Sequence, residues 1–421
     1  MTSSSATGDS PIEAGGDSER LYRLAEKCRV RVTRANTPIG QVIDGTLGLF
    51  ASDGGDADLT IVLGEYPLRS WEPSGFTVGD RLLYDSRSDS TTVFRRPTTS
   101  SLSKEGVEYV ICGDIREPDS HVLAYVPSLP KRMGYVRSLK RGLARGSLTR
   151  TVLAASGSDY IATELVELEA AKIRLAILEP FLYYRLPFTD STLVHGSVVS
   201  SSGSGLLFTG GGHIGKTALS LEMVRRGFAY LGDDLAIVGR DGRAFPYPEP
   251  IRIQEQHLTL FPELQQRLAS RMGAGERIMF HWMLGRNPGE ALELLPRLRI
   301  SEVFDGANVG GPCRIENALL IQKGTVSQPT LEEIDVDSIS RTVAAELFWE
   351  FETGHWRHNQ YIYARSCARG SDFLTEESEH RLRIKGIITD SFRNVRTFLL
   401  QVPYEFKITE AATYVDRILK K

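Results

Sequence analysis

One stretch of the sequence combines glycines, a lysine and a hydroxyl at spacings that suit phosphate chemistry. Residues 210–217 read GGGHIGKT and fit the pattern GxxxxGK[ST] without a mismatch. Glycines at such a turn let successive backbone N–H groups face phosphate oxygens, and the lysine adds a positive charge near the β- and γ-phosphates. The sequence therefore predicts a nucleotide-binding phosphate loop made of Gly210, Gly211, Gly212, His213, Ile214, Gly215, Lys216 and Thr217.

The runs on either side of this loop have the composition that a phosphate loop requires. LLFTG (206–210) predicts a short strand, and KTALSLEMVRRG after the loop predicts a helix that ends at Gly227. A helix that starts there directs the positive end of its dipole at the same anion. On a helical wheel its apolar residues share one arc, and Glu222 falls on the other arc with Arg225 and Arg226.

Two adjacent carboxylates follow the loop. The run FAYLGDDLAIV (228–238) predicts a buried strand that contains Asp233 and Asp234, 16 and 17 residues after Thr217. Buried carboxylates are unfavourable unless they bind metal or accept hydrogen bonds. One of them would hold Mg²⁺ together with the Thr217 hydroxyl, and the other would accept the proton of an attacking hydroxyl group. The alternative is a turn at the end of the strand whose acids are solvated.

Three further residues are candidates for the same site. His195 precedes a glycine in a predicted hairpin that leads into the loop strand, so it either lies beside the site or packs in the core. His213 would contact phosphate through its backbone and ring, or point to solvent. Arg252 follows a proline-rich turn and is the first candidate for a cation that stabilises a transferring phosphoryl group, ahead of Arg297 and Arg299.

The order of these features resembles a known family. His-Gly at the start of a strand, a hairpin, GxxxxGK[ST], a helix ending in Arg-Gly and a strand with Asp-Asp are arranged as in HPr kinase/phosphorylase. The run DDLAIVGRDGRAFPYPEPIRI (233–253) is similar to HPr-kinase-related kinases. The similarity covers about residues 195–253, with a weaker similarity near the C-terminus. It implies the phosphate-loop fold of phosphoenolpyruvate carboxykinase, kinase chemistry and assembly into a homo-oligomer.

The resemblance also implies roles for individual residues. Lys216 and Thr217 match the lysine and the hydroxyl of the family's phosphate loop. Asp233 matches the aspartate that accepts the proton, and Asp234 matches the one near Mg²⁺. His195 matches the histidine that supports the catalytic aspartate.

The rest of the chain divides by composition into regions that must position this site. We expect a disordered tail over 1–19, a β-rich N-terminal domain over 20–128 and a helical, basic linker region over 129–187. An α/β phosphate-loop kinase domain is expected over 188–421, with a helical insertion over 254–300 that would act as a lid.

Several apolar runs define these regions. Those at 30–35, 59–66, 81–85 and 107–113 predict N-terminal strands, and 159–187 predicts one or two helices that stop near Pro180 or Pro187. The runs at 315–324 and 395–408 predict strands, and a final helix follows them.

Residues 131–150 contain seven lysines and arginines and no acid. Such a segment is either a docking surface for an acidic partner or a solvated interdomain segment, and charge runs are more often the latter.

Composition narrows the class of protein. The chain has 421 residues and a net charge of −3, which argues against nucleic acid or membrane as a general partner. Its four cysteines are widely spaced, which argues against a zinc site or a disulfide scaffold. Without a signal peptide or an apolar span in the sequence, we expect a cytoplasmic protein.

These observations favour an ATP- and Mg²⁺-dependent kinase that acts on a hydroxyl of a protein, a peptide or a metabolite. GTP is an alternative nucleotide, since no base-reading motif is visible. A carboxykinase-like enzyme and a nucleotide-dependent regulatory or assembly NTPase are the alternative functions.

Overall fold

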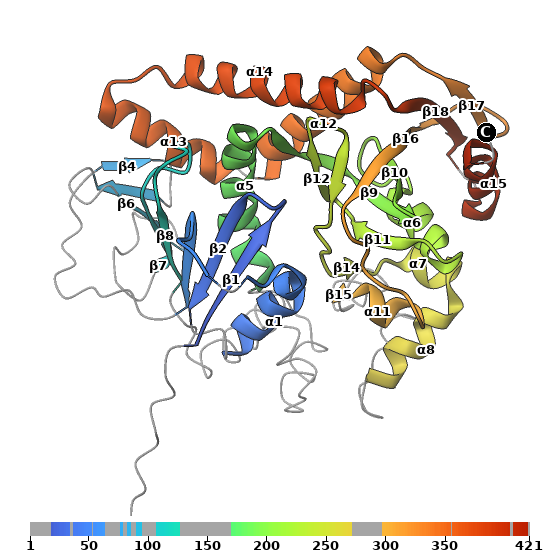
Figure 1. Ribbon diagram of the computed structural model, residues 1–421, viewed down its shortest axis with the longest axis horizontal. Helices are drawn as coiled ribbons and strands as arrows, with labels where there is room; N and C mark the ends of the chain where they lie inside the picture. The colour runs from blue at the N-terminus through green and yellow to red at the C-terminus, as the bar shows by residue number, and fades with distance from the viewer. Residues whose placement is uncertain are drawn as a thin grey trace, which may run out of the picture.

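The computed structural model describes residues 18–33, 37–52, 54–63, 76–78, 82–85, 90–94, 107–126, 170–271, 297–354, 356–404 and 407–419. In these ranges the protein is a mixed α/β structure with two large sheets, which lie side by side beneath a layer of helices (Figure 1). The tail 1–17, the basic segment 131–150 and residues 159–169 of the predicted helical run 159–187 lie outside the described residues. No helix of the described ranges is both long and apolar enough to cross a membrane.

The N-terminal sheet has eight strands in the order β1-β2-β3-β8-β7-β6-β5-β4. β2, β3 and β8 run parallel and the other neighbours are antiparallel. Its strands are β1 (Glu19–Leu24), β2 (Cys28–Thr33), β3 (Leu59–Leu63), β4 (Phe76–Val78), β5 (Leu82–Asp85), β6 (Ser90–Phe94), β7 (Val107–Cys112) and β8 (Val122–Val126). The four strands predicted in this region are confirmed as β2, β3, β5 and β7.

Helix α1 (Pro38–Leu47) connects β2 to β3. The Thr37 hydroxyl caps it by accepting a hydrogen bond from Gly40 N at 3.2 Å, and Pro38 occupies its first turn, where a missing N–H breaks no intrahelical bond. The buried side chains of Ile43 and Leu47 belong to the core that also contains the strands of this sheet.

The second sheet has the order β10-β9-β12-β13-β16-β18-β17, and an additional pairing of β10 with β16 closes its first five strands into a ring. β10, β16 and β18 run parallel to one another, and β11 pairs with β9. Its strands are β9 (Ser191–Ser201), β10 (Ser204–Thr209), β11 (Ala229–Gly232), β12 (Leu235–Gly239), β13 (Arg243–Phe245), β16 (Cys313–Gly324), β17 (Thr330–Glu333) and β18 (Arg396–Pro403).

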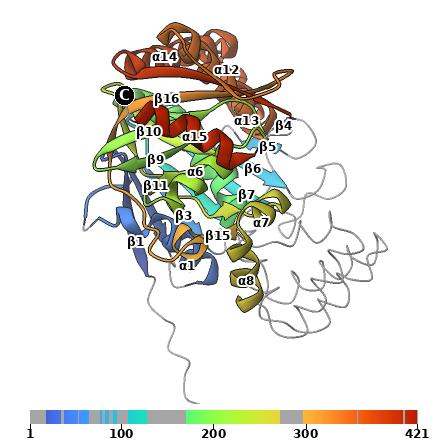
Figure 2. The same cartoon turned by 90° about the vertical axis from the view of Figure 1, so that its right-hand side faces the viewer.

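Alternation along β10 sends side chains into two cores. Leu206 and Phe208 pack with α6 (Lys216–Arg225) and α15 (Ile408–Leu419), whereas Leu207 packs with α12 (Val336–Gly354) and α14 (Phe373–Phe392). Figure 2 shows α6 and α15 on one face of the sheet, with α12 and α14 above it. The helix after the loop and the strand before it are therefore buried on both sides.

Glu222 departs from the wheel-based prediction. Although it lies on the arc opposite the apolar residues, it is only 2% exposed. Its two carboxylate oxygens accept hydrogen bonds from Arg225 and Arg226 at 2.8–2.9 Å, and Arg226 also bonds Asp416 of α15. Because α15 covers this side of α6, the carboxylate is buried but paired.

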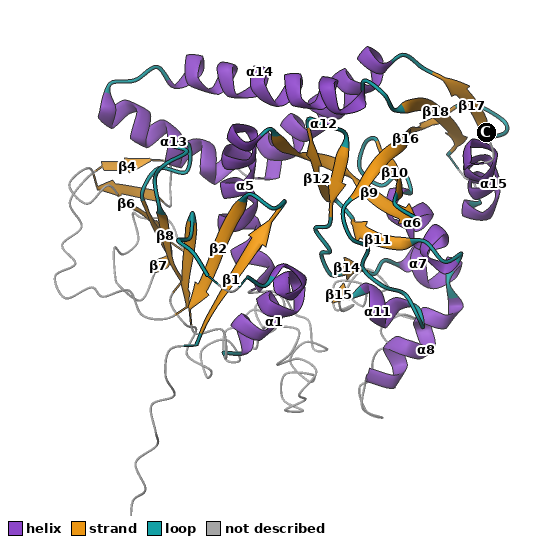
Figure 3. Cartoon of the chain, in the orientation of Figure 1, coloured by secondary structure: helices purple, strands orange, loops and turns teal. Residues whose placement is uncertain are grey.

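Smaller elements complete the chain (Figure 3). The helical segment before β9 runs through a π-helical stretch, η3 (Arg174–Leu178), and α5 (Glu179–Arg185), and ends in the 3-10 helix η4 (Leu186–Thr189), so it passes Pro180 and stops two residues after Pro187. β14 (Ile251–Arg252) precedes the predicted insertion, which contains α7 (Glu255–Leu260), α8 (Pro262–Arg271) and β15 (Arg297–Leu298) and is followed by α11 (Ile300–Val303). Residues 272–296 are outside the described part of the chain.

Helices α12, α13 (Trp356–Arg369) and α14 form the layer that connects the two sheets (Figure 1). No helix was predicted here. Ile339, Val343, Leu347 and Phe351 recur at four-residue spacing in α12 and are all buried, so the apolar pattern of a helix is present in the sequence.

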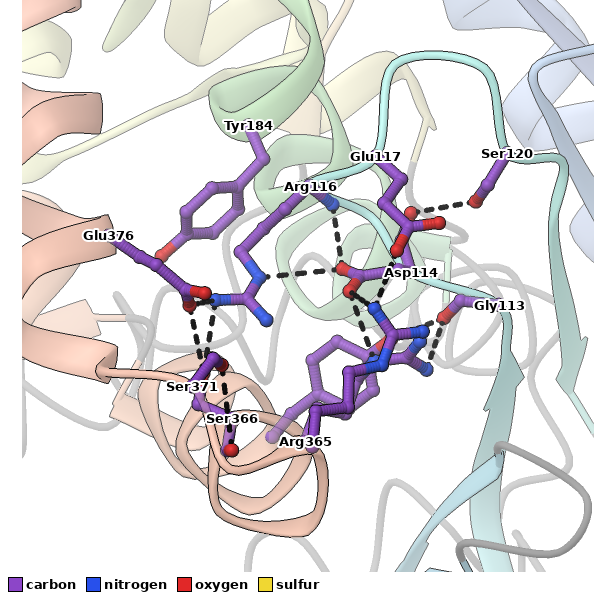
Figure 4. Close-up of polar contacts among 12 residues, drawn as sticks. Gly113, Asp114, Arg116, Glu117, Ser120, Tyr184, Arg365, Ser366, Ser371 and Glu376 are labelled. Carbon is purple, nitrogen blue, oxygen red and sulfur yellow. Dashed lines mark hydrogen bonds and ion pairs between the residues drawn. The ribbon is translucent and has the colours of Figure 1, made fainter.

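A buried group of charges attaches the N-terminal sheet to this layer (Figure 4). Asp114, in the loop between β7 and β8, forms ion pairs with Arg365 and Arg369 of α13 at 3.4 and 3.0 Å. It also accepts a hydrogen bond from Arg116 N at 2.9 Å, and Arg116 pairs with Glu376 of α14. We call these five residues the Asp114 cluster.

Candidate functional site

The predicted phosphate loop lies between β10 and α6 as a connection of six residues. Gly210, His213 and Gly215 have φ angles of 127°, 58° and 103°. Gly215 is the N-cap of α6 and provides no side-chain hydrogen bond to the helix. The first N–H groups of α6 thus have no capping side chain and face the loop, which is the arrangement an anion requires.

The three leading glycines differ in what surrounds them. A Cβ at Gly210 would lie 2.5 Å from the carbonyl oxygen of Ile321 on β16, so this glycine is required by packing as well as by its positive φ. A Cβ at Gly211 would meet only Glu346, at 3.7 Å, and one at Gly212 would meet nothing within 4 Å. The space beside the last two is open to a ligand.

Lys216 is buried, and its side chain lies inside the loop. Its Nζ donates hydrogen bonds to the carbonyl oxygens of Gly210 and Gly211, both at 2.8 Å. Burial lowers its pKa, and the nearby carboxylates of Asp233 and Asp234 oppose that shift. The ammonium group therefore sits inside the loop, held by neutral acceptors that a phosphate group could replace.

Asp233 is the buried carboxylate of the site. Its Oδ2 accepts a hydrogen bond from Thr217 Oγ1 at 2.8 Å, which joins the end of the loop to the Asp-Asp pair. Its Oδ1 is buried and makes no hydrogen bond with any residue of the described ranges. Burial raises the pKa of Asp233 to about 7, and the adjacent Asp234 adds to the shift.

The backbone explains why one aspartate is buried and the next is exposed. The predicted strand 228–238 is interrupted: β11 and β12 both pair with β9, and the two aspartates lie between them. Asp234 has a φ of 62°, and Leu235 N donates to Asp233 O at 2.7 Å across a tight turn. This turn points Asp233 toward Thr217 and leaves Asp234 at the surface.

His195 lies beside this turn. On β9 it is the register partner of Leu235, and the N–H of the next residue, Gly196, donates to Asp234 O at 3.1 Å. Its Nδ1 is 3.5 Å from Oε2 of Glu350 on α12 and makes no hydrogen bond in the described structure. Of the two alternatives for His195, the structure favours the one beside the site, with Glu350 as its charged neighbour.

Glu346 and Glu350 were missed by the sequence analysis. They lie one helical turn apart on α12, and both carboxylates favour the charged form of Lys216. Glu346 faces Gly211 and Glu350 faces His195. Their spacing of four residues in a helical pattern was a usable signal, but no local feature connects it to a loop 130 residues earlier.

The arginine candidates lie on the β14–β15 pair and directly after it. Arg252 of β14 is exposed and is the register partner of Arg297 on β15. Burial lowers the pKa of Arg297, as do Arg174 and Arg252, whereas Asp234 favours its charged form. Arg299 is exposed. Burial lowers the pKa of His257 on α7 to about 4, and the negative charge of Asp234 opposes this shift.

The donor atoms at the turn suit a hard cation. Within the described ranges no three His, Cys, Asp or Glu side chains form a ready metal cluster. Thr217 and Asp233 nevertheless bring a hydroxyl and a carboxylate oxygen together, Asp233 Oδ1 has no hydrogen-bond partner among the described residues, and the exposed carboxylate of Asp234 follows at the next position. Oxygen donors of this type, completed by phosphate oxygens and water, fit Mg²⁺.

No family model matches this chain, and no curated protein matches it either.

Proposed function

We propose that this protein is an ATP- and Mg²⁺-dependent kinase of the HPr-kinase-like type, which transfers the γ-phosphoryl group to a hydroxyl. The observation that carries the proposal is Asp233: a buried carboxyl with one unsatisfied oxygen, bonded to Thr217 of a phosphate loop. Its pKa of about 7 suits a general base near neutral pH.

The loop would bind and orient the nucleotide. Backbone N–H groups of residues 210–216 would face the β- and γ-phosphates, and Lys216 would exchange its two carbonyl acceptors for phosphate oxygens. Mg²⁺ would be held by Thr217 and Asp234 and would neutralise charge on the phosphates. Catalysis of phosphoryl transfer consists mainly of such positioning and charge stabilisation.

Asp233 would handle the proton. Its Oδ1 would accept the proton of the acceptor hydroxyl. The hydroxyl oxygen would then bond to the γ-phosphorus, and the bond between the γ-phosphorus and the bridging oxygen of the β-phosphate would break, which releases ADP. Arg252 would stabilise the transferring charge from the side of Asp234. His195, with Glu350 beside it, would support the turn that carries both aspartates.

The test is transfer from γ-labelled ATP and Mg²⁺ to fractionated lysate of the native host. Wild type is compared with Lys216→Ala, Asp233→Asn and the exposed control Asp241→Asn. We expect wild type and Asp241→Asn to label one acceptor. We expect Lys216→Ala and Asp233→Asn to label none. Nucleotide binding or hydrolysis without a labelled acceptor would replace the kinase by a regulatory NTPase.

A further inference from the structure

A cavity lies between the N-terminal sheet with α1 on one side and the β14–β15 pair on the other. Its apolar wall includes Val42, Ile43 and Leu47 of α1, Ile61 of β3, and Ile173 and Leu178 from the helical segment before β9. Figure 1 places α1 next to the β14–β15 pair, and Figure 2 places it next to β15. The cavity is therefore lined by segments that lie far apart in the sequence.

The other side of the same cavity is cationic. Arg174, Arg297 and Arg299 line it. Arg174 is neutralised by Glu179, at 3.3 Å, and by Glu249. Arg297 is half-buried and forms no ion pair with any carboxylate of the described residues, and it lies opposite Arg252 on the paired strand. Neighbouring positive charges repel one another, and an anion that joins them relieves this repulsion.

Arg297 also connects the cavity to the proposed reaction centre. Its strand β15 pairs with β14, where Arg252 lies opposite, and the charge of Asp234 acts on Arg297. The cationic part of the cavity thus lies within electrostatic range of Asp234, and residues of α1 line its apolar part.

We propose that this cavity binds the phosphoryl acceptor, and that the acceptor is an anionic amphiphile. This inference rests on the proposed function. An apolar body would pack against α1 and Ile173, and a carboxylate or phosphate would pair with Arg297, which would leave the acceptor's hydroxyl on the side of Asp233. The N-terminal domain would then supply half of the acceptor site.

The probe is 8-anilinonaphthalene-1-sulfonate, which carries an apolar ring system and one anionic group, and its uncharged counterpart is N-phenyl-1-naphthylamine. Both are titrated by fluorescence into the full-length chain. We expect one sulfonate site per chain, weakened about tenfold or more in Arg297→Gln, the value of one charged hydrogen bond. The uncharged probe should bind both proteins equally. Arg243→Gln, which changes a half-buried arginine that does not line the cavity, should bind both probes as wild type does.

A second variant tests the apolar wall. Thr46 lines the cavity from α1, so Thr46→Trp should fill it and abolish binding of both probes. Decanoate and decyl phosphate, compared with decanol as competitors, distinguish a carboxylate from a phosphate ligand. Equal sulfonate binding by wild type, Arg297→Gln and Thr46→Trp would overturn the proposal, and so would displacement by decanol as effective as by both anions.

The proposed kinase function is tested separately, by measuring the binding of Mg-ATP. Mg-ATP binding should be unchanged in Thr46→Trp and lost in Lys216→Ala, which should still bind the sulfonate probe. If the wild-type protein bound the sulfonate probe but no Mg-ATP, the kinase proposal would be refuted and the cavity result would stand. If it bound Mg-ATP but not the probe, only the cavity proposal would be refuted.

Discussion

Two aspartates, Asp114 and Asp233, are almost equally removed from solvent, yet their surroundings shift their pKa values in opposite directions. They are 2% and 6% exposed. At Asp114 burial opposes ionisation, but Arg365 and Arg116 hold the pKa below its usual value. At Asp233 burial raises the pKa to about 7, with Asp234 adding to the shift. The number of cationic partners, rather than burial, separates the two.

The comparison distinguishes a charge that holds two parts of the structure together from one that is proposed to act in the reaction. Around Asp114 both carboxylate oxygens have partners, and Arg365 also bonds Gly113 O at 2.8 Å (Figure 4). Around Asp233 one oxygen has no hydrogen-bond partner in the described part of the chain, and the nearby cation, Lys216, donates its hydrogen bonds to carbonyl oxygens instead. Buried groups are normally satisfied, so an unsatisfied one in a loop-lined site indicates where a ligand belongs.

Asp233→Asn should have the largest effect on activity. Removal of the proposed base should lower the rate of phosphoryl transfer about 10²–10⁴-fold, the usual contribution of general-base catalysis. The measurement is single-turnover transfer from Mg-ATP to the labelled acceptor at pH 8. Because the amide keeps the size of the side chain and removes repulsion from Asp234, the free energy of unfolding at this pH should not fall. A variant that transfers at the wild-type rate would exclude Asp233 as the base.

Asp114→Asn should show the reverse pattern. It leaves Arg365, which is fully buried, without its carboxylate, and breaking a buried pair in this way costs about 3–5 kcal/mol. Urea unfolding should detect this loss, while the transfer rate per folded molecule stays close to that of wild type. Arg243→Gln is the matched control for an exposed pair, because Arg243 bonds Asp241 at the surface. A stable Asp114→Asn protein with impaired transfer would remove the distinction between the two regions.

The two aspartates should also give opposite dependences of stability on pH. Asp114 has a lowered pKa, so its contribution is present above the unfolded value of 3.8 and is lost as pH falls through its folded pKa. Asp233 has a raised pKa, so its contribution is present below 3.8 and is lost as pH rises toward about 7. Urea unfolding of wild type and Asp233→Asn at pH 4 and pH 8 should show the variant gaining stability relative to wild type only at the higher pH.

The same pKa predicts the pH profile of transfer. The rate should rise as pH increases through about 7, because only ionised Asp233 accepts a proton. Asp234→Asn removes the neighbouring charge and should move this limb to lower pH, whatever its effect on the maximal rate through Mg²⁺. If the rate of Asp234→Asn rises over the same pH range as that of wild type, a group other than Asp233 controls this part of the profile.

The loop and the turn differ from the Asp114 cluster in how far sequence could predict them. β10, α6 and the hairpin at His195 were predictable because glycine spacing and short apolar runs are local signals. The Asp114 cluster joins residues about 250 positions apart, and nothing in the sequence around Arg365 specifies that its partner is a loop of the N-terminal sheet. For the same reason Glu346 and Glu350 were missed, since only the packing of α12 brings them to the loop.

Local patterns were also wrong where a second element covered the first. The helical wheel separated Glu222 from the apolar residues of α6, but it could not show that α15 would bury that arc. The predicted strand 228–238 was interrupted because its two acids take up a turn with a positive φ at Asp234. The contacts of this turn with β9 outweigh the strand propensity of the run 228–238.

The smallest expected effect tests whether the space beside Asp233 belongs to a ligand. In the loop as it stands a Cβ at Gly212 meets nothing within 4 Å, so Gly212→Ala should leave the free energy of unfolding unchanged within about 0.5 kcal/mol. Gly210→Ala, whose Cβ would meet the backbone of β16, should instead destabilise the protein by itself. If phosphates bind at the open glycines, Gly212→Ala should weaken Mg-ATP binding measured by calorimetry although the empty protein is intact. Equal affinity in Gly212→Ala and wild type would place the phosphates elsewhere, and the unsatisfied oxygen of Asp233 would then need another explanation.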